Sequence, residues 1–131
     1  MEAARRWNPG KDRVRLTKLG LQVADVRPLL ERIVSAFGNN AAARLLGLSP
    51  AVVSRVRRGA ETSPETSRRI TALYSVLARA MAVFEPRVAV EWLTAGREPL
   101  LGDARPLDVL AARGPGPVLE ALDGIEAGVM G

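Results

Sequence analysis

The feature that most constrains the fold is a repeated pattern in which proline opens an apolar stripe and glycine closes it. Proline lacks the N–H that the first helical turn leaves unbonded, and glycine tolerates the backbone conformation that ends many helices. Apolar residues between these signals recur at helical spacing. The pattern predicts helices over about 25–37, 39–47, 50–58, 63–84 and 85–96, a short helix after Pro106 and a last helix after a break at 114–117. No segment alternates like a strand, so we predict an all-α fold.

Charge is distributed unevenly along the 131 residues. Residues 1–84 carry 15 basic and 6 acidic side chains, net +9, whereas residues 85–131 carry net −4. The asymmetry suggests a polyanionic partner for the first part and a different partner for the second, although chance segregation on a solvated surface would look the same. We expect a basic N-terminal arm or a poorly ordered terminus over 1–24, a helical domain over 25–84 and a second helical domain over 85–131.

The absence of histidine and cysteine excludes disulfides, zinc fingers, iron–sulfur centres and His- or Cys-dependent nucleophilic catalysis. No phosphate-binding loop or dinucleotide fingerprint is present. We therefore expect no enzymatic activity, no metal and no cofactor. The N-terminus lacks an apolar signal region and no stretch reaches membrane-spanning length, so we expect a soluble cytoplasmic protein.

Residues 39–59 carry the pattern of a helix-turn-helix. Ala43 is small enough for two helices to touch, and Gly47 suits a turn that needs positive φ. Leu46, Val53 and Val56 would form a miniature core, with Leu48 filling the turn. A helical hairpin used only for packing is the alternative.

The outer face of the second of these helices is chemically suited to DNA. Ser49 opens the helix, whose N-terminus attracts phosphate. Ser54 and Arg55 can reach base edges, with Arg55 suited to guanine. Phosphate contacts are expected from Arg44, Arg57 and Arg58.

The C-terminal 45 residues resemble a known domain in the order and spacing of several short motifs. These motifs are Trp92-Leu93, Pro99-Leu100-Leu101-Gly102, Pro106-Leu107-Asp108-Val109-Leu110, the glycine break at Gly114 and Gly116, Val118-Leu119 with Leu122, and Ile125-Glu126-Ala127-Gly128-Val129. With the helix-turn-helix, residues 30–131 resemble the Xre/MbcA/ParS-type antitoxin family.

Membership of that family would imply an antitoxin of a type II toxin–antitoxin system. Its usual partner is a RES-domain toxin that consumes NAD or uses it for ADP-ribosylation. The resemblance implies that residues 85–131 bind this toxin and block its NAD pocket. It also implies that the Xre-like part, residues 25–84, dimerises and often represses its own promoter.

Candidate toxin contacts follow from the residues of this second domain. An acidic row would suit the basic rim of a dinucleotide pocket, an apolar tail could insert into a cleft, and the 99–102 loop could present a leucine. The candidates are Trp92, Leu100, Leu101, Glu120, Asp123, Glu126, Val129 and Met130. A buried Trp92, a solvated acidic face and a frayed tail are the alternatives. We also expect deletion of residues 118–131 to abolish neutralisation and leave DNA binding intact.

Three functions remain open at this stage. The first is an antitoxin that neutralises a RES-domain toxin and binds operator DNA as a homodimer. The second is a stand-alone helix-turn-helix repressor without a toxin, and the third is a toxin-binding module that has lost DNA binding.

Overall fold

The computed structural model describes residues 25–128, and this part of the chain is all-α. Its elements in chain order are α1 (Arg27–Phe37), α2 (Asn39–Leu46), α3 (Pro50–Arg57), α4 (Pro64–Val83), α5 (Pro86–Thr94), the 3₁₀ turn η1 (Pro99–Leu101), α6 (Pro106–Arg113) and α7 (Pro115–Glu126). The predicted fold class is confirmed. No helix within 25–128 combines the length and apolarity needed to cross a membrane.

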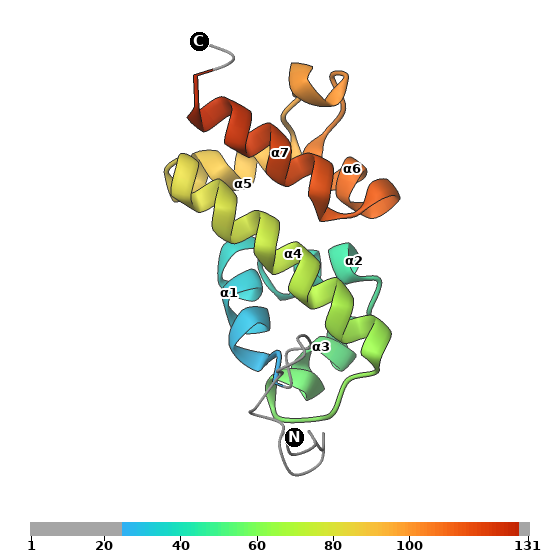
Figure 1. Cartoon of the computed structure of the whole chain (residues 1–131). Helices are drawn as coiled ribbons and strands as arrows, with labels where there is room; N and C mark the ends of the chain where they lie inside the picture. The colour runs from blue at the N-terminus through green and yellow to red at the C-terminus, as the bar shows by residue number, and fades with distance from the viewer. Residues whose placement is uncertain (1–24, 129–131) are drawn as a thin grey trace, which may run out of the picture.

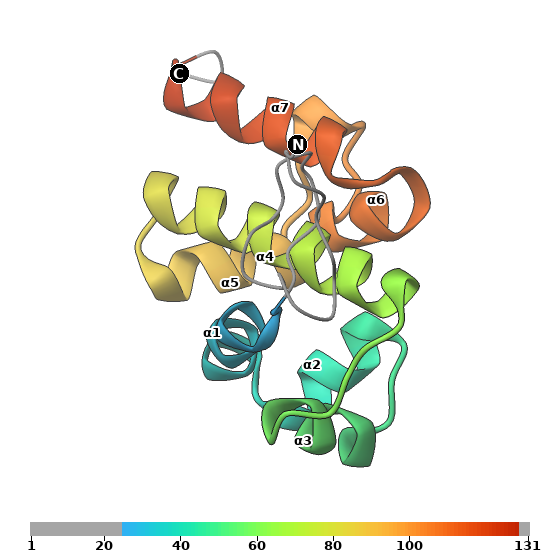
Figure 2. The same cartoon turned by 60° about the horizontal axis from the view of Figure 1, so that its bottom comes forward.

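Helix α4 lies at the centre of the structure (Figure 1). Helices α1, α2 and α3 gather along one side of it, α6 and α7 lie on the other, and α5 folds back beside its C-terminal end. The turned view in Figure 2 shows the same division. A helix of 20 residues is about 30 Å long, so α4 can serve both groups of helices.

A single hydrophobic cluster runs through both predicted domains. It begins at Val26, passes through the buried face of α4 and reaches Leu122 in α7. Leu30 of α1, Leu77 of α4 and Leu122 are each fully or almost fully buried. The predicted boundary at residues 84 and 85 falls in the short turn between α4 and α5, and the core is continuous across it.

The helices predicted from residues 50 and 63 begin at Pro50 and Pro64, each directly after a serine. Ser49 caps α3 by accepting the Val52 N–H at 3.1 Å, and Ser63 caps α4 by accepting the Thr66 N–H at 3.1 Å. Proline then occupies the first helical position in both helices, where its missing N–H costs nothing.

Other predicted helix ends require correction. The 114–117 stretch is not a break, because only Gly114, with φ +84°, separates α6 from α7. Pro115 and Pro117 lie in the first turn of α7, which proline tolerates because these N–H groups have no helical partner. Helix α1 begins at Arg27 rather than at residue 25; its N-cap is Val26, and Asp25 accepts the Arg27 N–H at 3.0 Å.

The turn between α2 and α3 depends on Gly47. This residue has φ +70°, in the left-handed region, and its N–H returns to the carbonyls of Ala43 and Arg44. A Cβ added here would lie 3.0 Å from Nη1 of Arg69, which covers the turn. Ala43, Leu46, Val53 and Val56 are all buried, as the sequence predicted.

Replacement of Gly47 by alanine is expected to lower the free energy of unfolding by about 1–2 kcal/mol. The cost arises because a Cβ disfavours the left-handed conformation. Urea denaturation of Gly47→Ala and wild type would measure it. Gly116→Ala is the matched control, because Gly116 is helical and its added Cβ would meet nothing within 4 Å. The control should keep or raise stability, by up to about 1 kcal/mol, and equal stability of Gly47→Ala and wild type would contradict the prediction.

Candidate nucleic-acid and protein-binding surfaces

The seven arginines of residues 37–84 fall into two groups. Four of them form ion pairs with acidic side chains, namely Arg57, Arg68, Arg69 and Arg79. The other three, Arg44, Arg55 and Arg58, are exposed and make no side-chain hydrogen bond or ion pair with any residue of the described part of the chain. All three belong to α2 and to α3 with its C-terminal cap.

Each of the three unpaired arginines carries a positive charge that no described residue neutralises through an ion pair. Arg44 lies in the last turn of α2, Arg55 in the last turn of α3, and Arg58 is the C-cap residue of α3. An arginine without an internal acceptor can bind a phosphate or a base edge without first breaking a native ion pair. The sequence prediction for these residues is thus compatible with their placement.

The two predicted serines differ in what they can offer DNA. Ser49 is exposed, but its Oγ already accepts the Val52 N–H as the α3 cap. Ser54 is half-buried in α3. Ser49 therefore has a structural role that any DNA contact would share, and Ser54 is less accessible than Arg55.

The side chain of Arg57 is bound within the protein. Its Nε lies 2.9 Å from Oε2 of Glu31, and its Nη2 lies 3.0 Å from Oε1 of the same carboxylate. The hydrogen bonds from Arg57 lower the pKa of Glu31 below its ordinary value of 4.5. Phosphate could engage Arg57 only in competition with this bidentate pair.

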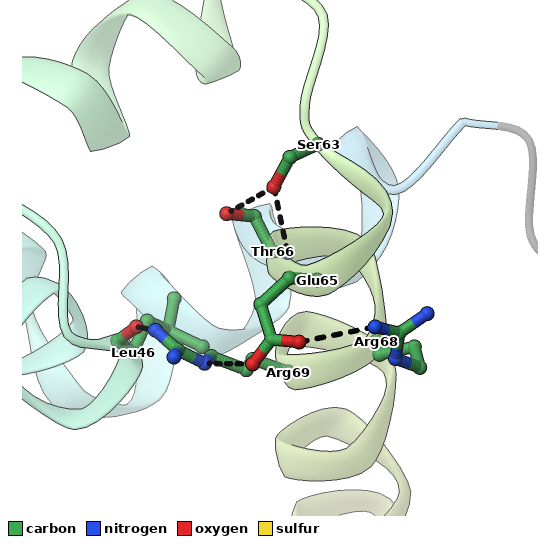
Figure 3. Close-up of polar contacts among 6 residues, drawn as sticks. All are labelled: Leu46, Ser63, Glu65, Thr66, Arg68 and Arg69. Carbon is green, nitrogen blue, oxygen red and sulfur yellow. Dashed lines mark hydrogen bonds and ion pairs between the residues drawn. The ribbon is translucent and has the colours of Figure 1, made fainter.

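The start of α4 fixes the α2 end against the rest of the fold (Figure 3). Glu65 accepts hydrogen bonds from Arg68 at 3.0 Å and from Arg69 at 3.1 Å. Arg69 also donates to the carbonyl of Leu46, the last residue of α2, at 3.1 Å. A cation at this carbonyl end satisfies a group that the helix leaves unbonded and complements its dipole.

A buried carboxylate organises the loop between α5 and α6. Glu98 is 5% exposed and accepts hydrogen bonds from Nε1 of Trp92 at 2.9 Å and from the Leu100 N–H at 3.0 Å. Its backbone also pairs with Ala104 as an isolated bridge. Sequence reasoning missed Glu98, since a glutamate before proline in a polar loop carries no signal of burial.

The predicted toxin contacts of this loop occupy different environments. Trp92 is half-buried and stacks obliquely on Phe84, with ring centroids 5.7 Å apart. Leu101 is half-buried against the core, whereas Leu100 is 39% exposed at the tip of η1. Of the two leucines of this loop, Leu100 is therefore the one that is exposed to solvent.

Arg79 of α4 forms ion pairs with two of the three members of the predicted acidic row on α7. Arg79 donates to Oδ1 of Asp123 at 2.9 Å and also pairs with Glu126. These hydrogen bonds, the one to Glu126 first, raise the pKa of Arg79. Glu120 is exposed without an ion pair to any described residue, so it is the member of the row that is free to contact a partner.

The other two predicted contacts, Val129 and Met130, lie outside the described residues, as does the arm over 1–24.

An open groove of about 1120 Å³ lies between α1, α4 and α5. Its walls include Tyr74, Met81 and Val90, with Arg32 and Glu91 among the charged lining residues. None of the predicted site residues within 25–128 lines it. Within residues 25–128 no group of acidic side chains is arranged to hold a metal ion.

Comparison with known proteins gives no relative for this chain: no family model, curated protein or solved structure matches it.

Replacement of Trp92 by phenylalanine is expected to lower the free energy of unfolding by about 1–3 kcal/mol. The change keeps an aromatic ring but deprives the buried Glu98 carboxylate of one donor, and an unsatisfied buried acceptor is costly. Denaturation in urea measures the loss. Tyr74→Phe is the control, because the half-buried Tyr74 hydroxyl makes no hydrogen bond to a described residue, and it should change stability by less than about 0.5 kcal/mol. Equal effects of the two substitutions would show that the Trp92–Glu98 bond contributes nothing.

Proposed function

We propose that the protein is the antitoxin of a type II toxin–antitoxin system, which binds operator DNA and neutralises a RES-domain toxin. The observation that carries the DNA-binding half is that three of the four unpaired arginines of residues 25–84 belong to α2 and to α3 with its C-cap, the fourth being Arg32 of α1. The toxin-binding half rests on the resemblance of the C-terminal motifs and on the exposed groups of that region.

DNA binding would use α3 as the helix that enters the major groove. Arg55 is the candidate for base reading, while Arg44 and Arg58 would hold phosphates on either side. At the N-terminus of α3 Pro50 has no N–H and the Val52 N–H is bonded to Ser49, so the contribution of this helix end to binding a polyanion would come mainly from the helix dipole. A two-fold homodimer would pair two such helices with a palindromic operator.

Neutralisation would proceed by occlusion of the toxin's NAD pocket. Leu100 is an exposed apolar anchor on a loop that Glu98 holds in place, and such anchors dominate the affinity of many interfaces. Glu120 adds a negative charge that would complement a basic pocket rim. The chain supplies no chemistry to this step, because it excludes substrate rather than transforming it.

The second candidate is a stand-alone helix-turn-helix repressor without a toxin. It is favoured by the internal use of the C-terminal side chains: Asp123 and Glu126 pair with Arg79, and Trp92 donates to Glu98. In that case α5, α6 and α7 would only complete the core. A toxin-binding module without DNA binding is the third possibility, and the unpaired arginines weigh against it.

Co-expression with the neighbouring open reading frame separates the two main functions. The antitoxin is expected to rescue growth, to co-purify with the neighbour's product and to suppress NAD consumption by that product. Absence of both a complex and growth rescue would favour the stand-alone repressor.

Deletion of residues 118–131 is unsuitable as a test, because it removes the buried Val118 and Leu122 from the core. Loss of neutralisation in that truncation would therefore report unfolding as readily as a missing contact.

A surface substitution tests the toxin contact without disturbing the core. Leu100→Asp is expected to weaken toxin binding at least tenfold, because it places a charge at a desolvated anchor. Val88→Asp is the control, since Val88 is exposed to a similar extent, 43%, but lies on α5. Titration calorimetry of the purified pair measures both variants. If Leu100→Asp binds as tightly as Val88→Asp, the η1 tip is not the anchor.

Arginine substitutions test the DNA contact. Arg58→Ala should weaken binding to operator and shuffled DNA alike and reduce the slope of log affinity against log salt by about 0.9. Arg55→Ala should weaken operator binding selectively. Arg113→Ala, which removes an exposed arginine of α6, is the control and should leave affinity near wild type. An equal loss for Arg55→Ala on both DNAs would contradict base reading by Arg55.

A further inference from the structure

Arg57 ties together three helices of the predicted DNA-binding unit. It is the last residue of α3, and its guanidinium reaches Glu31 of α1 through two nitrogens at 2.9 and 3.0 Å. Its third nitrogen, Nη1, lies 3.3 Å from Oδ1 of Asn39, the first residue of α2. The amide of Asn39 in turn donates to the carbonyl of Pro50 at 3.5 Å. We call this set of four residues the α3 clamp.

The α3 clamp holds both ends of the helix. Pro50 is the first residue of α3 and Arg57 is the last, so one hydrogen-bonded chain joins its two ends to α1 and α2. The middle of the helix is held separately by the buried Val53 and Val56. Apolar packing allows a short helix to slide or roll, whereas a planar bidentate pair fixes direction.

Orientation matters here because base reading tolerates little displacement. A side chain that reads a base edge must be held within about 0.5 Å of its productive position. The unpaired Arg55 lies two residues before Arg57 on the same helix. Whatever fixes the rotation of α3 therefore fixes where Arg55 points.

We propose that Arg57 is a positioning residue, which with Glu31 and Asn39 orients α3 for base reading and does not contact phosphate. The proposal rests on the proposed DNA-binding function and changes the role predicted for Arg57 from the sequence. The competing role is a phosphate contact, in which Arg57 leaves Glu31 when DNA arrives.

The two roles predict opposite effects of removing the Glu31 carboxylate. If Arg57 is a positioning residue, Glu31→Ala loosens α3 and lowers the preference for operator over shuffled DNA at least fivefold. If Arg57 contacts phosphate, the same change removes the competing carboxylate, so binding to both DNAs tightens, while the salt slope keeps its wild-type value because the contact already exists there. Glu61→Ala is the control for the change of net charge, because Glu61 is exposed and has no hydrogen bond or ion pair to a described residue.

Two substitutions of Arg57 itself separate charge from geometry. Arg57→Lys keeps the positive charge but cannot form the bidentate pair. A positioning role predicts that Arg57→Lys and Arg57→Ala both lose operator preference at least fivefold with an unchanged salt slope. A phosphate contact predicts that Arg57→Lys binds nearly as wild type, while Arg57→Ala lowers the slope by about 0.9.

The experiment uses the full chain and two duplexes, one from the promoter preceding its own gene and one of shuffled sequence, over a salt series. Hydrogen exchange of the backbone amides is measured on the same variants without DNA. Faster exchange in α3, with α6 unchanged, is expected for Glu31→Ala and Arg57→Lys. Wild type that does not prefer promoter DNA would refute the proposed function. Exchange in α3 like that of wild type, or tighter DNA binding by Glu31→Ala than by Glu61→Ala, would overturn the positioning role.

Discussion

Burial of the middle of α4 is the interaction on which the rest of the structure depends. This helix has neighbours on both sides. Its most buried side chains, each at most 2% exposed, are Ile70, Leu73, Val76, Leu77 and Ala80. Full burial of a valine, leucine or isoleucine is worth about 1.5–3 kcal/mol. Because α1 and α7 both pack on this helix, the predicted DNA-binding and toxin-binding regions share one core. A change in either region therefore acts on a helix that the other also contacts.

The arginines of this fold include some that are paired with other helices and others that have no partner among the described residues. Arg57, Arg69 and Arg79 each join helices that are distant in sequence, and each does so through a carboxylate or a carbonyl. Arg44 and Arg55 have no such partner among the described residues. Exposed ion pairs contribute little stability individually, so their main effect here is on the orientation of the helices that they join. They fix helix directions that apolar contacts leave adjustable.

The C-terminal half also contains polar side chains that are paired within the fold and others that are not. Glu98 and Trp92 use their polar groups on each other, and Arg79 occupies two carboxylates of the acidic row. A partner would therefore meet a few protruding groups, chiefly Leu100 and Glu120, on a rigid support. Rigid support lowers the entropy lost on association, which favours affinity from a small contact set.

The sequence alone determined the all-α class, the two Ser-Pro helix starts and the Ala43–Gly47 turn, because helical spacing, caps and positive φ act within a few residues. It did not separate Arg57 from Arg58, which are adjacent and chemically identical, nor did it indicate that Glu98 is buried. It also misplaced the break at 114–117, which is the single residue Gly114. These outcomes depend on Glu31, Trp92 and other partners brought close by packing around α4. Only the tertiary structure decided which charged side chains are paired within the fold and which have no partner among the described residues.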